Sequence, residues 1–166
     1  MGQKWINTTM DNVKEVLETV RRLNADYNFM SVISEDLALE CADNAKKVSG
    51  PLSGYFITIK DCVVVKGVES TASSRILKGY KPVFDATVVE KIKAAGGIII
   101  GKTLQDEFGF GSFSVNTGLD YDIPKNPLNK DCAAGGSSGG SAVATALLAK
   151  EGIKHIAIAE STGGSI

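Results

Sequence analysis

The feature that most restricts the fold is a pair of glycine- and serine-rich turns near the C-terminal end of the sequence. Residues 135–141 read Gly-Gly-Ser-Ser-Gly-Gly-Ser, and residues 160–166 read Glu-Ser-Thr-Gly-Gly-Ser-Ile. Between them, an alanine-rich run predicts a helix and a short apolar run predicts a strand. Glycines allow backbone N–H groups to point at a ligand or an oxyanion, so a serine in such a turn is a candidate nucleophile.

Composition excludes several classes of protein. The 166 residues fit one domain, and 43% hydrophobic with 22% charged residues is typical of a globular chain. A net charge of −1 argues against a stand-alone nucleic-acid binder. No apolar run reaches membrane-spanning length and no signal peptide is recognisable, so we expect no membrane partner and a cytoplasmic location.

Cysteine and histidine usage limits the chemistry. Cys41, Cys62 and Cys132 are odd in number and widely spaced, which indicates neither a zinc site nor a disulfide framework. The single histidine, His155, begins an apolar run, where a structural role is more common. An activated serine would then need another base, for which lysine is the commonest alternative.

Apolar spacing predicts alternating helices and strands, which favours an α/β fold. We expect helices over residues 11–23, 34–47, 86–95 and 138–150, with Asp85 as the cap of the third and a short helix near 106–111. We expect strands over residues 29–33, 55–61, 98–100 and 155–159, and an extended loop over 118–131.

Lys60 stands near the end of the strand expected over residues 55–61, which is apolar nearly throughout, as in strands buried on both faces. The pattern leaves two positions for this lysine. In the first, the strand reaches the protein surface at this residue and Lys60 is exposed to solvent, which periodicity alone favours. In the second, Lys60 is buried at the end of a core strand.

Residues 96–103 match the P-loop pattern Gly-x-x-x-x-Gly-Lys-Thr, but their context argues against phosphate binding. A P-loop follows a strand and precedes a helix, whereas here a helix is expected first and the middle contains three consecutive isoleucines. We therefore interpret this stretch as helix, turn and strand, with Lys102 near the strand end.

Five stretches, taken together and in order, resemble the amidase signature family: residues 50–61, 85–96, 101–108, 135–141 and 161–166. The resemblance implies an α/β fold with a mixed β-sheet flanked by helices and an N-terminal helical pair. It also implies that residues 1–166 form the N-terminal part of a single amidase signature domain. The C-terminal part, expected on another chain if the protein is naturally split, would cover an otherwise open apolar sheet edge.

The same resemblance implies a Ser–Ser–Lys triad. Ser165 would be the nucleophile that attacks a carboxamide carbon, and Ser137, held by a cis peptide bond, would relay the proton. Lys60 would be the base and must be neutral, which burial at the end of an apolar strand favours. The resemblance therefore favours the buried position for Lys60.

Further site residues come from the same resemblance. The backbone N–H groups of Thr162, Gly163 and Gly164 would form the oxyanion hole, and Phe110 and Gly111 would line the amide pocket.

Within the family, residues 106–111 and 125–127 are most similar to the glutamine-hydrolysing subunits of tRNA-dependent amidotransferases. This implies glutamine as the substrate and ammonia transfer to Glu-tRNA(Gln) or Asp-tRNA(Asn) on partner subunits. The tRNA would be bound mainly through those partners, ATP and Mg²⁺ would belong to one of them, and this chain itself would hold no cofactor or metal.

Two positions depart from the family pattern: Ser161 stands where aspartate is usual, and Cys62 where asparagine is usual. Either could change the hydrogen bonds around the site. Two alternatives therefore remain open beside the glutaminase: a general carboxamide amidohydrolase and an inactive truncated remnant.

Overall fold

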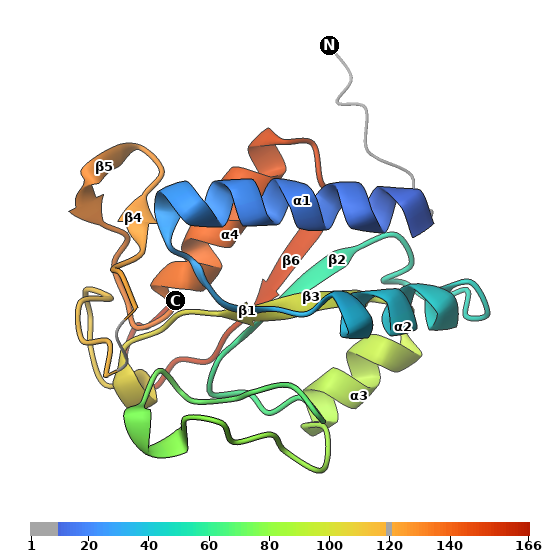
Figure 1. Ribbon diagram of the computed structural model, residues 1–166, viewed down its shortest axis with the longest axis horizontal. Helices are drawn as coiled ribbons and strands as arrows, with labels where there is room; N and C mark the ends of the chain where they lie inside the picture. Colours follow the sequence, from blue (N-terminus) through green and yellow to red (C-terminus); the bar gives the residue numbers. More distant parts are fainter. Residues whose placement is uncertain (1–9, 119–120) are drawn as a thin grey trace.

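The computed structural model describes residues 10–118 and 121–166 (Figure 1). In chain order the α-helices are α1 (Met10–Tyr27), α2 (Glu35–Ala45), α3 (Thr87–Ala94) and α4 (Gly139–Lys150). The strands are β1 (Met30–Ile33), β2 (Phe56–Lys60), β3 (Ile98–Thr103), β4 (Lys125–Asn126), β5 (Asn129–Ala133) and β6 (His155–Ile158). Two short 3₁₀ turns are η1 (Arg75–Leu77) and η2 (Glu107–Gly109).

Four strands form a mixed sheet in the order β1-β3-β2-β6. β3 and β6 run parallel to β2, and β1 runs antiparallel to β3. Every residue of β2 and β3 is buried, which explains why both strands are mainly apolar instead of alternating. The predicted α/β class with a mixed sheet is confirmed.

Helices cover the sheet on both sides, with α1 and α4 above it in the view of Figure 1 and α3 below. The apolar stripe of α1 is buried, and α2 packs on β3 and contacts both α1 and α3. The stripe consists of Val13, Val16, Leu17, Val20 and Leu23. The expected N-terminal helical pair is therefore present, with β1 between its two helices.

The edge of the sheet at β1 depends on a glycine. Gly101 has a φ of +151°, and a Cβ built there would collide with the carbonyl oxygen of Val32 on β1. Only glycine allows this approach without a shift in the backbone, and it coincides with an irregularity in the β2–β3 register. The residues of the P-loop pattern thus form a turn and a buried strand, as the sequence predicted.

Two local predictions were wrong. Ala86, not Asp85, is the N-cap of α3, because the Asp85 carboxylate accepts a hydrogen bond from the Lys66 N–H at 2.7 Å and pairs with Lys93 at 2.6 Å. The loop expected over residues 118–131 contains β4 and most of β5, which form a two-stranded hairpin.

Within the part of the chain that the structure describes, β6 pairs only with β2, so its other edge is free. None of the described helices combines the length and apolar character that crossing a membrane would require.

Candidate active site

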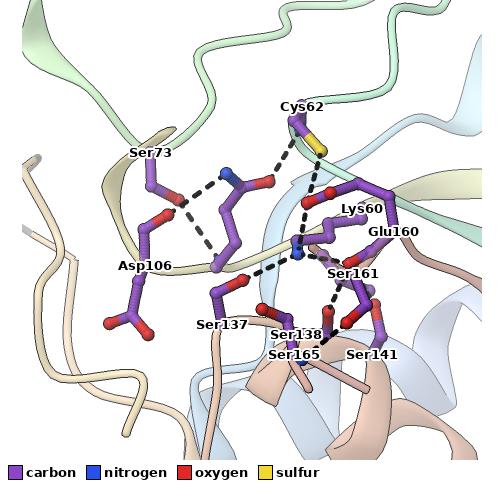
Figure 2. A network of polar contacts seen from close by, with 12 residues as sticks. Lys60, Cys62, Ser73, Asp106, Ser137, Ser138, Ser141, Glu160, Ser161 and Ser165 are labelled. Carbon is purple, nitrogen blue, oxygen red and sulfur yellow. Dashed lines mark hydrogen bonds and ion pairs between the residues drawn. The ribbon is translucent and has the colours of Figure 1, made fainter. Parts of the chain in front are cut away.

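Lys60 is the last residue of β2, and its side chain is fully buried. Its Nζ donates to three oxygens: Ser137 Oγ at 2.9 Å, the Glu160 carbonyl at 3.0 Å and Glu160 Oε1 at 2.7 Å (Figure 2). The solvent-exposed position for this lysine, which the residue pattern alone favoured, is therefore wrong. Lys60 lies at the end of a core strand and points at the first glycine-serine turn.

Ser137 is also fully buried, and the peptide bond between Gly136 and Ser137 is cis, as the resemblance implied. Its carbonyl accepts from the Asp106 N–H at 3.1 Å, and the Gly136 N–H donates to the Ser112 carbonyl at 2.9 Å. The turn that carries Ser137 is thus fastened by backbone hydrogen bonds to the segment that follows β3.

Ser165 lies in the second glycine-serine turn, and its backbone is held at both ends. Its carbonyl accepts from the Ser138 N–H at 3.1 Å, and its N–H donates to Ser161 Oγ at 2.8 Å. Within residues 10–118 and 121–166, the Ser165 hydroxyl makes no hydrogen bond with Ser137 or any other group. The structure joins Lys60 to Ser137 and places Ser165 beside the start of α4, while the role of its hydroxyl stays a prediction.

The expected oxyanion donors lie in the same exposed turn. The Gly164 N–H donates to Ser161 Oγ at 3.0 Å, so the serine that replaces the usual aspartate already takes one of these donors. Thr162 and Gly163 are exposed. The assignment of these three N–H groups to an oxyanion hole remains a prediction.

Phe110 and Gly111 follow η2 on a loop near the site. Phe110 is 78% exposed, and a Cβ built at Gly111 would collide with the Asp106 carboxyl group. That carboxylate accepts from the N–H groups of Ser114 at 3.0 Å and Asn116 at 2.9 Å, which fixes the loop from the inside. The role of Phe110 and Gly111 in substrate binding stays a prediction.

A cavity of about 660 Å³ opens beside these turns. Small residues line it, from the first turn, the first half of α4, the edge strand β6 and the C-terminal turn; they include Gly135, Ser138, Ser141, Thr145, Ala157 and Ser165. The hollow is wide enough for a small substrate or for packing by a further segment of protein.

Cys62 and Glu160 lie near Lys60, although neither was assigned a role in the site from the sequence. Gln105 Oε1 accepts from the Cys62 N–H at 2.8 Å, and the Cys62 thiol lies 3.7 Å from Glu160 Oε1. Burial raises the pKa of the Cys62 thiol to about 11, although nearby Lys60 opposes the shift, so the thiol is neutral at pH 7. Glu160 approaches Lys60 because the chain turns back directly after β6, which residue spacing does not reveal.

A second lysine is buried behind the first. Lys102 Nζ contacts Asp61 Oδ1 at 3.3 Å and Ser70 Oγ at 2.8 Å, and both charged side chains are fully buried. Burial lowers the pKa of Lys102, and the adjacent Asp61 opposes that shift. The other carboxylate oxygen of Asp61 accepts from the Thr71 hydroxyl at 2.5 Å and the Ser73 N–H at 3.1 Å. This network supports the strand end that carries Lys60.

Among the residues described, no group of three or more His, Cys, Asp or Glu side chains is arranged to hold a metal ion.

Comparison with known proteins identifies the family of the chain. Residues 11–166 match the family described as Amidase. A glutamyl-tRNA(Gln) amidotransferase subunit from Lachnoclostridium phytofermentans is 40% identical over 161 residues, covering 93% of this chain and 31% of the relative.

Solved structures give the same result. The corresponding glutamyl-tRNA(Gln) amidotransferase subunit of Thermotoga maritima is 35% identical with a TM-score of 0.68, covering 80% of this chain and 27% of that one. A vestigial protein complex described as revealing the origins of an s-triazine catabolic enzyme is 32% identical with a TM-score of 0.76, covering 83% of this chain and 31% of that one.

The chain spans about a third of the length of the curated relatives it matches. The family match extends over nearly all of it, and the buried Lys60–Ser137 contact and the cis peptide bond are where the resemblance placed them. The chain therefore belongs to the amidase signature family.

Proposed function

We propose that this chain carries the catalytic residues of a glutaminase that supplies ammonia to a tRNA-dependent amidotransferase. The observation that carries the proposal is the 2.9 Å contact between Lys60 Nζ and Ser137 Oγ, two groups that are both fully buried. A lysine amine beside a hydroxyl is suited to accept the proton of that hydroxyl. The Ser138 N–H, next to Ser137 in the chain, donates a hydrogen bond to the Ser165 carbonyl, so the turn that carries Ser165 lies against the turn that carries Ser137.

In the proposed reaction the Ser165 oxygen attacks the side-chain amide carbon of glutamine. The Ser165 proton passes to the Ser137 oxygen as the Ser137 proton passes to the neutral amine of Lys60. The tetrahedral intermediate then collapses, its C–N bond breaks, and the proton returns through Ser137 to the leaving nitrogen as ammonia departs. Water repeats the sequence on the resulting ester, which releases glutamate and restores Ser165.

The negative oxygen of that intermediate would be stabilised by the N–H groups of Thr162, Gly163 and Gly164. A donor of this kind contributes about 3–4 kcal/mol where one has been removed by mutation. The Gly164 N–H would have to leave Ser161 Oγ, its acceptor at 3.0 Å, as the oxyanion forms. Phe110 and Gly111 would border the amide group from the neighbouring loop.

The proposed assembly has further parts. The relatives named as glutamyl-tRNA(Gln) amidotransferase subunits are about three times as long as this chain, so a remaining part of the domain, continuous or on another chain, would pack along the free edge of β6. Partner subunits would hold the Glu-tRNA(Gln) or Asp-tRNA(Asn), and the ATP and Mg²⁺ that activate it. A cytoplasmic location would suit that role in protein synthesis.

A second candidate is an amidase for another carboxamide. The similarity to a complex connected with s-triazine catabolism favours it, because this part of the fold is then shared by proteins with different substrates. In either case the remaining part of the domain would recognise the rest of the substrate.

The test is ammonia release from glutamine by the assembled protein, compared with release from apolar amides of similar size. The proposal expects glutamine to be preferred and Ser165→Ala to abolish release. Preference for an apolar amide would favour the second candidate. Equal release by the wild type and Ser165→Ala would refute both, as an inactive remnant predicts.

A further inference from the structure

The Glu160 carboxylate lies against the lysine that the proposed reaction needs as a base. Glu160 Oε1 is 2.7 Å from Lys60 Nζ, closer than Ser137 Oγ at 2.9 Å. The side chain of Lys60 is fully buried, whereas that of Glu160 is 44% exposed. The ion pair therefore joins a buried cation to a carboxylate at the rim of the site.

The oxygens around Lys60 accommodate its charged form, and one of them belongs to a carboxylate. An ammonium has three N–H donors and no lone pair, and Nζ here has three oxygen neighbours. The Glu160 carbonyl and Glu160 Oε1 can only accept, whereas the Ser137 hydroxyl can accept or donate. A neutral amine has two N–H groups and needs its lone pair directed at the Ser137 hydroxyl to take that proton. A carboxylate in contact favours the charged form.

We propose that Glu160 is a positioning residue that holds Lys60 as an ammonium and so restrains hydrolysis at neutral pH. The inference rests on the proposed function, because it concerns the protonation state that the Ser–Ser–Lys mechanism requires. The site becomes competent when Glu160 turns away from Lys60 or loses its charge. The exposure of Glu160 leaves room for that movement without disturbing the core.

The other ionisable groups near Lys60 are engaged elsewhere. The Cys62 thiol, 3.7 Å from Glu160 Oε1, is neutral at pH 7 because burial raises its pKa. Asp61 and Lys102 pair with each other. The Asp106 carboxylate accepts hydrogen bonds from backbone N–H groups of its own loop. Among the described residues, Glu160 is thus the carboxylate in contact with the Lys60 ammonium.

The test is Glu160→Gln, which keeps the shape of the side chain and removes its charge. Labelling of Ser165 by a fluorophosphonate is followed against pH in the assembled protein. We expect labelling at pH 7 to rise at least about tenfold and the acid limb of the pH profile to move down by about one unit or more. The matched control is Glu151→Gln, which removes a carboxylate 3.1 Å from Arg22 on the surface and should leave the profile unchanged.

A second readout is independent of reactivity. In protein with ¹³C-labelled lysine, the Lys60 side-chain signal, assigned with Lys60→Met, distinguishes ammonium from amine. At a fixed pH of about 9 we expect a larger amine fraction in Glu160→Gln than in the wild type. Equal amine fractions, an unchanged pH profile or loss of labelling in Glu160→Gln would overturn the inference. If no variant is labelled at all, the proposed function fails, while the NMR comparison still decides the role of Glu160.

Discussion

Replacement of Asp61 by asparagine tests the buried network behind the site. Asp61 Oδ1 lies 3.3 Å from Lys102 Nζ, and both side chains are fully buried. Asparagine keeps the size of the side chain but leaves a buried ammonium without its counter-charge. Breaking a buried pair in this way typically costs about 3–5 kcal/mol, a large fraction of the stability of a single domain.

Urea unfolding followed by circular dichroism measures the effect. A loss of this size lowers the midpoint by at least about 1 M for a chain whose denaturant dependence is in the usual range. Asp26→Asn is the matched control, because Asp26 also lies 3.3 Å from a lysine, Lys130, but the two side chains are 64% and 49% exposed. We expect the control to change stability by no more than about 1 kcal/mol.

A double variant, Asp61→Asn with Lys102→Met, separates charge from packing. Since it removes both charges while the amide oxygen of the asparagine can still accept from Thr71 and Ser73, it should recover most of the stability that Asp61→Asn alone loses. Equal effects of Asp61→Asn and Asp26→Asn would refute the reasoning. So would a double variant that is less stable than Asp61→Asn.

Three further predictions concern single residues. Burial lowers the pKa of His155 from 6.5 to about 4, so the unfolded chain binds more protons than the folded chain between these pH values. The free energy of unfolding should therefore fall by up to about 3 kcal/mol from pH 6.5 to 4, and His155→Phe should flatten that part of the curve of stability against pH. Gly111→Ala should lower the free energy of unfolding by about 1–3 kcal/mol through collision with the adjacent carboxyl group, whereas Gly163→Ala, with open space around it, should have little effect on unfolding. Iodoacetamide at pH 8 should modify exposed Cys132 at least about tenfold faster than Cys62, whose pKa is about 11, as peptide mass spectrometry would measure.

Long elements were predictable from the sequence because burial determines their residue pattern. The stripe of α1 repeats at helical spacing, and β2 and β3 are mainly apolar because both faces are covered. The β4–β5 hairpin was missed because most of its residues are exposed, so its side chains carry no such pattern. Asp85 was wrongly expected to cap α3. An aspartate can accept hydrogen bonds from a helix N-terminus, but it can equally accept them from another backbone N–H and a lysine, as Asp85 does from Lys66 and Lys93.

The site was predictable only in part. Lys60 and Ser137 are 77 positions apart, and their contact was expected from the family resemblance, not from spacing. The placement of Glu160 depends on how the chain turns after β6, a backbone property with no signature in the residue types. The position of Ser165 relative to Ser137 depends on the conformation of an exposed turn, for which sequence gives equally little information.

The most direct measurement of the central claim is the site and rate of fluorophosphonate modification in the assembled protein, determined by peptide mass spectrometry. The account predicts a single adduct on Ser165, abolished by Ser165→Ala and strongly slowed by Lys60→Met, because Lys60 contacts the Ser137 hydroxyl at 2.9 Å. An adduct on another residue, or modification of Ser165 at the same rate in Lys60→Met, would contradict it.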